Sequence, residues 1–249
     1  MSTQGVIKIS GKPINAKQLI VSYSMLPESD ADEMGYFISI WEGKQPGAEE
    51  QALKTLKIKT GLQVGRVSFE ELSLDKKDYV VGFSISGAAG RCICATLNFS
   101  ANVDAELAIT TSLSNVFVPA DRIGTNFLIA NFITPLSLNK SSNWIALFPG
   151  AFKSDFYDGA NVLGFAKAAV NQNSGVIIMK DIPKHLSRFG TYTVVLGMGL
   201  DKFGNPDYKT LMSSHTFIVW KSSFYVASSA FRNTPVMGLF PSFFQPNLN

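Results

Sequence analysis

Large and small side chains alternate along several short stretches of this chain. In residues 79–85 and again in residues 192–198, every second position carries a Tyr, Val, Phe, Leu, Ile or Met. A period of two places these large side chains on one face of an extended strand, which turns that face toward a core. The pattern predicts β-strands at both places.

Two other stretches are apolar at every position except Ser39. Residues 37–41 and 144–148 repeat a large–small–large series on one face, and the face opposite it is apolar as well. A strand that is apolar on both faces is typical of a central strand covered on both sides. We expect one side to be covered by the strand's own sandwich and the other by something else.

These stretches belong to a longer internal repeat, because four segments recur in the same order at separations of 107 to 113 residues. Such a recurrence indicates that one structural unit has been duplicated. The matched segments are 19–23 with 128–132, 37–43 with 144–150, 65–69 with 175–179, and 79–85 with 192–198.

Helical signal is scarce in this chain. Only residues 49–56 and the Ala-rich residues 161–170 could form short surface helices, and both occupy the same place in the repeat. The segments between the expected strands, such as residues 27–35 and 201–207, are rich in turn-forming residues.

The repeat predicts an all-β fold of two tandem immunoglobulin-like antiparallel β-sandwich units, with short surface helices and an irregular aromatic C-terminal arm. The units would span residues 1–103 and 104–220, and the arm residues 221–249. Each unit has the size of an immunoglobulin-like sandwich. Residues 6–9 and 107–110 are the expected opening strands.

The second unit resembles the SKICH family of sandwich domains. In that family, an extended segment ending in Thr-Pro precedes an aromatic strand, Asp-Trp-Ile/Val-Gly-Leu-Phe. In this chain, residues 131–135 end in Thr-Pro and precede Asn143-Trp144-Ile145-Ala146-Leu147-Phe148. Tyr192 and the closing strand 217–219 complete the match. Asn143 replaces the family's Asp and Ala146 its Gly. The resemblance implies an adaptor module that binds proteins or membranes and performs no chemistry.

Composition adds a constraint on the exterior. Charged residues make up 16% of the chain and apolar residues 46%, whereas charged residues are roughly 25% of an average soluble domain. Either the cores are unusually large or other subunits cover part of the surface, and we favour the second interpretation. The first 125 residues carry a net charge of −2 and the remainder +5, which favours head-to-tail contact between copies unless it reflects chance on two solvated surfaces.

Several classes of partner and compartment have no support in the sequence. No basic run suggests nucleic-acid binding. Neither a signal-peptide pattern nor a stretch of about 18 apolar residues is visible, so we expect a cytoplasmic protein, with release by lysis left open. Cys92 and Cys94 lie two residues apart, a spacing that opposes a disulfide on one strand and suits small buried side chains.

Candidate chemistry is weak, so we expect no enzyme. The histidines are His185 and His215, and no Gly-x-Ser-x-Gly motif surrounds a serine; a structural role is favoured for both over a hydrolytic one.

No metal or cofactor is expected either. Cys92-Ile93-Cys94 has no second ligand pair. The acidic residues 28–33 read as a solvated turn rather than a calcium loop, because they lack the spaced bidentate glutamate.

The final segment is the part of the sequence that calls for a function. It is charged only at Lys221 and Arg232, and Pro235, Pro241 and Pro246 prevent one regular element. Burying a phenylalanine contributes about 1.5–3 kcal/mol, so this segment should pack against its own sandwiches or, as we favour, on a neighbouring subunit. Its candidate interaction residues are Phe224, Tyr225, Phe231, Met237, Phe240, Phe243 and Phe244.

These features predict a non-catalytic protein that binds itself, and possibly another protein, to form an oligomer, particle or inclusion. The alternative is a host-directed toxin or lectin-like protein whose aromatic side chains contact a membrane or glycan. A hydrolase that uses His185 or His215 is a remote third hypothesis.

Overall fold

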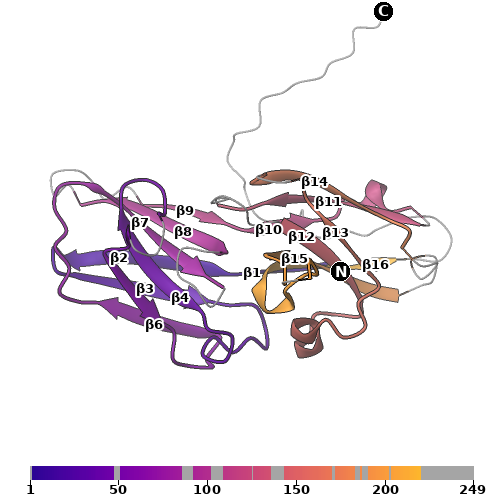
Figure 1. Ribbon diagram of the computed structural model, residues 1–249, viewed down its shortest axis with the longest axis horizontal. Coiled ribbons are helices and arrows are strands. Elements are labelled where there is room, and N and C mark those ends of the chain that lie inside the picture. The colour runs from indigo at the N-terminus through magenta and orange to yellow at the C-terminus, as the bar shows by residue number, and fades with distance from the viewer. Residues whose placement is uncertain are drawn as a thin grey trace, which may run out of the picture.

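Antiparallel strands dominate the computed structural model (Figure 1), which describes residues 2–47, 51–85, 92–101, 109–124, 126–135, 143–169, 172–182, 186, 190–201 and 203–219. The helical elements that lie wholly within these ranges are short 3₁₀ helices, η2 (Ala120–Arg122), η3 (Ser154–Asp158) and η5 (Tyr208–Thr210). The predicted all-β sandwich fold is confirmed.

The first sandwich consists of a three-stranded and a five-stranded sheet in the described part of the chain. The smaller sheet has the order β2 (Lys8–Asn15), β3 (Gln18–Ser24), β6 (Val64–Phe69). The larger has the order β5 (Lys54–Lys57), β4 (Phe37–Glu42), β7 (Asp78–Ser84), β8 (Ile93–Ser100), β9 (Thr110–Leu113).

The second sandwich repeats this plan beside the first (Figure 1). Its smaller sheet has the order β10 (Asn115–Phe117), β11 (Phe127–Ile133), β14 (Ser174–Lys180). Its larger sheet has the order β1 (Thr3–Val6), β16 (Leu211–Val219), β15 (Gly190–Met198), β12 (Asn143–Pro149), β13 (Gly164–Lys167).

The strand register is the same in both sandwiches. Every repeated segment falls on a strand, and residues that pair in the first sandwich have counterparts that pair in the second. Matching pairs are Leu19–Phe69 with Leu128–Met179, and Ile38–Phe83 with Ile145–Leu196. The predicted repeat is therefore confirmed as a structural one.

Each sandwich takes one edge strand from the segment that precedes the other sandwich. β1 pairs with β16 of the second sandwich, starting from Thr3 opposite Thr216. β9 pairs with β8 of the first sandwich, with Thr110 opposite Asn98. We call this reciprocal pairing the strand exchange. Because of it, β1 lies before the predicted boundary at residues 103 and 104 but belongs to the second sandwich, and β9 lies after that boundary but belongs to the first.

The expected opening strand at residues 6–9 is confirmed only for Lys8 and Ile9, and the one expected at residues 107–110 was wrong in its partner where the structure describes it. Val6 ends β1 in the second sandwich, and Lys8 begins β2 in the first, so only the buried Ile7 separates two sheets. Thr110 begins β9 in the first sandwich. The reason is an open edge on β8 and on β16, whose unpaired backbone groups accept whichever extended segment lies beside them.

The two expected surface helices were also wrong where the structure describes them. Lys54–Lys57 forms β5 and Gly164–Lys167 forms β13, and each pairs with the outer side of a central strand. Backbone pairing with β4 and β12 prevails over the helix propensity of these residues, because propensity is a weak preference that tertiary contacts override.

One continuous core joins the sandwiches. Buried side chains of both units, among them Tyr36 and Phe156, belong to a single packed cluster. At the junction the Tyr36 hydroxyl donates to the carbonyl oxygen of Lys209 over 3.1 Å. The backbone N–H of Ser154 donates to the Glu28 carboxylate over 2.5 Å. The two units therefore share their packing as well as their strands.

Candidate interaction surface

The side chains predicted to make intermolecular contacts lie outside the described residues, which end at Val219 on β16. Their role stays a prediction. They are Phe224, Tyr225, Phe231, Met237, Phe240, Phe243 and Phe244.

The second apolar face of the central strands is covered by the chain itself. Phe148 on β12 stacks on Phe156 of η3 with ring centroids 4.1 Å apart. Trp144 meets the edge of Tyr208 of η5 at 5.3 Å, and its indole N–H donates to the carbonyl oxygen of Gly199 over 2.7 Å. On β12, the cover beyond the sandwich that we expected from the pattern is thus supplied by the 3₁₀ turns η3 and η5 of the same chain.

A different sheet face exposes apolar side chains. It lies on the outer side of β11 and β14, and we call it the β11–β14 face. Ile129 and Ile178 are cross-strand partners on it, and Asn131 faces Val176. Exposed fractions are 54% for Val176 and 50% for Ile178. Its apolar members are Phe127, Ile129, Ile133, Val176 and Ile178.

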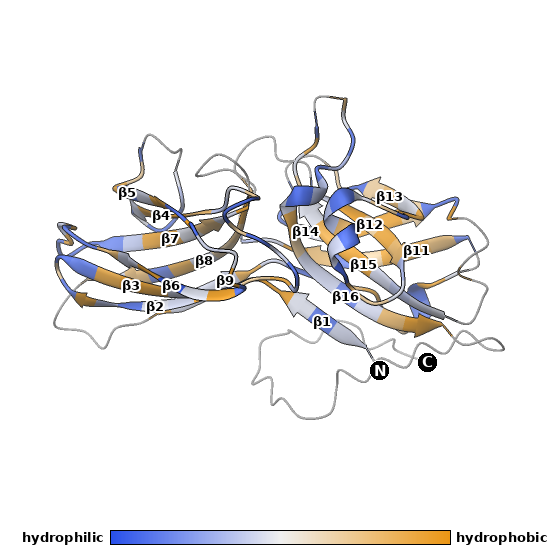
Figure 2. Ribbon diagram, turned by 90° about the horizontal axis from the view of Figure 1, so that it is seen from below, coloured by the Kyte–Doolittle hydropathy of each residue, from blue (hydrophilic) through white to orange (hydrophobic). Residues whose placement is uncertain are grey.

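The equivalent face of the first sandwich is mainly polar. The identical register places Arg66 where the second sandwich has Val176, and Ser68 where it has Ile178. The Gln18 amide donates to the Ser68 hydroxyl across this polar surface over 3.3 Å. Figure 2 shows hydrophobic colouring along much of β11 and mixed colouring on the β2, β3 and β6 side. The fold itself therefore does not require apolar residues at these positions.

Sequence reasoning missed this face, although the repeat contained a signal for it. β6 alternates Arg66 and Ser68 with apolar residues, whereas residues 176–179 of β14 are apolar without interruption. Aligning the two copies position by position would have exposed the difference, because a strand with one solvated face normally alternates.

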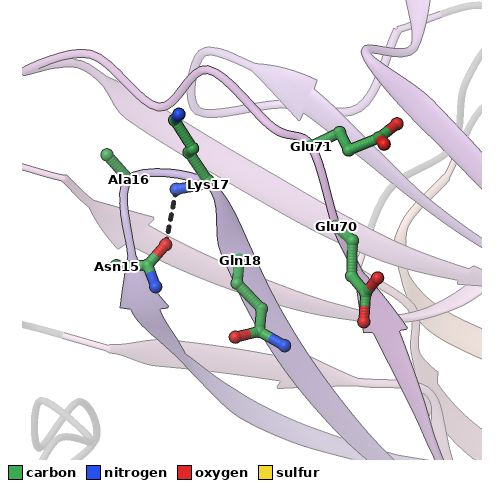
Figure 3. A pocket seen from close by; sticks show the side chains of 6 residues that line it. All are labelled: Asn15, Ala16, Lys17, Gln18, Glu70 and Glu71. Atoms are coloured by element: carbon green, nitrogen blue, oxygen red, sulfur yellow. Dashed lines mark hydrogen bonds between the residues drawn. The ribbon is translucent and has the colours of Figure 1, made fainter.

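The hollow drawn in Figure 3 lies at the β2–β3 turn and is open to solvent. Its charged side chains, Lys17, Glu70 and Glu71, point in different directions in this view. The backbone N–H of Lys17 donates to the side-chain oxygen of Asn15 over 2.8 Å, a contact that stabilises the turn. An open hollow of mixed charge, without a buried polar group, does not define a ligand.

Of the two histidines, His185 lies outside the described residues and His215 is buried in the second sandwich. The His215 ring meets the edge of Phe117 at 5.2 Å and lies 6.1 Å from Phe217. Neither ring nitrogen has a hydrogen-bond partner within the described ranges. Burial lowers the pKa of His215 to about 4. The same register places Leu97 at the matching position of the first sandwich, which indicates a core position.

The acidic loop makes turn contacts. The Asp30 carboxylate accepts the backbone N–H groups of Asp32 and Glu33 over 3.0 and 3.1 Å. Lys57 forms an ion pair with Asp32 at 2.7 Å. Within the described segments, no three His, Cys, Asp or Glu side chains gather closely enough to hold a metal ion.

Both cysteines are buried and neither is in a disulfide, as the spacing predicted. Burial raises the pKa of the Cys94 thiol well above its ordinary value. Among the helical segments that the structure describes, none has the length and apolar character needed to cross a membrane.

Comparison with solved structures finds likenesses in 113 chains. No family model and no curated protein matches the chain, so the SKICH resemblance stays a prediction. A crystal structure of the FN1–FN3 domains of chicken CNTN1 aligns at 10% identity over 82% of this chain and 59% of that one, with a TM-score of 0.24. The chain thus spans less than two thirds of that structure, and so low a TM-score supports no conclusion about function.

Proposed function

We propose that this is a non-catalytic protein of structural or interaction type that associates with copies of itself, through an apolar sandwich face and the C-terminal arm. The observation that carries the proposal is the β11–β14 face, with Val176, Ile178 and Ile133 each about half exposed.

Apolar side chains of the β11–β14 face that stay in water favour association. Covering the exposed half of one Val or Ile side chain contributes about 1 kcal/mol. Several such side chains on one flat sheet face form a continuous apolar surface, which is characteristic of contact sites. Association is the simplest way for a chain with 16% charged residues to cover it.

The C-terminal arm supplies the second element of the proposal. Its aromatic side chains would enter an apolar surface of a neighbouring copy. The net charges of −2 and +5 on the two parts of the chain would favour an orientation that brings unlike parts together.

The test measures native mass by size-exclusion chromatography with light scattering. Deleting residues 222–249, or replacing Phe240, Phe243 and Phe244 by Ser in the full chain, should lower the mass. The control replaces Leu62 and Val64, exposed on the first sandwich, by Ser and should leave it unchanged. A full-length chain that is monomeric at every concentration would contradict the proposal.

One observation favours a second candidate, a toxin or lectin-like protein that binds a membrane or glycan. Phe203 is 76% exposed in a loop held by hydrogen bonds: Asp201 accepts the N–H groups of Phe203 and Asn205 over 2.8 Å, and Lys167 donates to Gly204 over 2.7 Å. Liposome flotation and a glycan array test it. Binding that Phe203→Ser removes would support this candidate, and its absence on both would reject it.

A further inference from the structure

We propose that the β11–β14 face of one copy is the docking site for the C-terminal segment, residues 221–249, of a second copy. This inference rests on the proposed self-association and adds the surface that receives the arm.

The face has the shape of a receiving surface. Ile129 and Ile178 form a cross-strand pair at its centre, and Ile133 and Val176 are diagonal neighbours on the same two strands. Side chains so placed on an antiparallel pair lie within contact distance of one another. The result is a continuous apolar strip along two strands, bordered at one end by Lys180 opposite Phe127.

The duplication provides an internal comparison for this strip. The two sandwiches keep the same register, but Val176 and Ile178 replace the counterparts Arg66 and Ser68. Stability of the sandwich does not explain the difference, since the first sandwich forms the same sheet with polar side chains there. A contact made only by the second sandwich does explain it.

The occupant must be apolar and must lie outside the described residues. The 30 residues after Val219 meet both conditions, with six aromatic side chains in residues 221–249 and only Lys221 and Arg232 charged. Fully extended, a segment of this length reaches roughly 100 Å. Its three prolines suit an irregular chain lying along a sheet face better than a helix or a paired strand.

We place the segment on a second copy because the exterior has other apolar side chains to cover. Ile14, Leu53 and Phe165 are each more than 40% exposed. A segment folded on its own face would leave them in water. Segments exchanged between two copies cover both β11–β14 faces and also bring the bodies of the copies into contact.

The first experiment asks which chain supplies the segment. A photo-crosslinking amino acid replaces Ile178 in the full-length protein, isotopically light and heavy copies are mixed and equilibrated, and cross-linked peptides are identified by mass spectrometry. The expected products join position 178 to residues 221–249, with light peptides linked to heavy ones. The same cross-linker at Ser68 is the matched control and should not reach the segment. Products of a single isotope only would mean that the segment folds on its own chain and would overturn the proposal.

The second experiment weakens the face in the full chain. Val176→Arg with Ile178→Ser introduces the side chains of the matching positions in the first sandwich and should raise the dissociation constant of self-association by at least about tenfold. Leu62→Ser with Val64→Ser removes two comparably exposed apolar side chains and should leave it unchanged. Circular dichroism verifies that both variants are folded.

The outcomes separate the docking site from the proposed function. If tail substitutions lower the mass and the face variant does not, self-association stands and this docking site is wrong. If the face variant lowers the mass and tail substitutions do not, two faces meet directly and the segment is not the occupant. A monomeric wild-type chain contradicts both proposals.

Discussion

Replacing His215 by Leu should stabilise the protein and remove part of its sensitivity to acid. The imidazole is 2% exposed, and neither nitrogen has a hydrogen-bond partner among the described residues. The first sandwich has the buried Leu97 at the matching position. The substitution therefore introduces a side chain that the same fold already accommodates.

The magnitude follows from the pKa of His215. Burial lowers this pKa from 6.5 to about 4, and one pKa unit corresponds to about 1.4 kcal/mol. Between these values the unfolded chain binds the proton more tightly than the folded one. The contribution of the neutral ring to the free energy of unfolding is therefore fully present above about pH 6.5. It falls by about 3 kcal/mol as the pH drops to 4. Above pH 7, removing the unpaired polar atoms should add about 1–2 kcal/mol.

Urea unfolding followed from pH 8 to pH 4 measures both effects. The difference in free energy of unfolding between His215→Leu and wild type should widen by about 3 kcal/mol across this range. His185→Leu, which removes the other histidine, serves as the control for general effects of losing an imidazole. A difference that stays constant with pH would refute the burial argument, and so would destabilisation of His215→Leu at pH 8.

Two further substitutions test packing and the junction. Gly197→Ala would bring a methyl group within 2.1 Å of the buried ring of Trp144, so we expect the free energy of unfolding in urea to fall by about 3 kcal/mol and tryptophan fluorescence to change. Gly190→Ala on the same strand meets its nearest atom at 3.5 Å and should resemble wild type, so equal stability of both variants would contradict the packing of Trp144 against Gly197. Tyr36→Phe removes the hydroxyl that donates to Lys209 across the junction and should cost about 1 kcal/mol in a single unfolding transition; an unchanged midpoint would show that this bond contributes nothing.

The repeat made much of the fold predictable from sequence. Residues 79–85 and 192–198 carry a strong period of two, and both coincide with central strands, β7 and β15. Matching separations along the chain also implied matching register. Local pattern and tertiary pairing agree at these positions, because each strand buries one face against its own sandwich.

The strand exchange could not be predicted in the same way. β1 and β9 have the sequences Thr-Gln-Gly-Val and Thr-Thr-Ser-Leu, which have little apolar periodicity. Their position is determined by an open edge on a strand more than 200 residues away for β1, information that no local window contains. Residues 54–57 show the same effect at the edge of β4, where pairing replaced an expected helix.

The candidate site was only partly accessible from sequence. Low charge and the aromatic segment indicated contact with a partner, but the apolar pattern pointed to residues 144–148, whose outer face is closed by Phe156 and Tyr208. The exposed strip containing Val176 and Ile178 emerges only when burial is known. The aromatic residues of the arm remain a prediction.

The pairing of β1 with β16 also determines how the molecule responds to a pulling force. Thr3 lies opposite Thr216 and Val6 opposite Ser213, so the first residue of β1 and the last residues of β16 lie at the same end of the strand pair. A load applied between Thr3 and Val219 would therefore unzip the backbone hydrogen bonds pair by pair, which requires less force than shearing them all at once. Mechanical opening should begin at β1, and loss of that strand would uncover the edge of β16 before either core is breached.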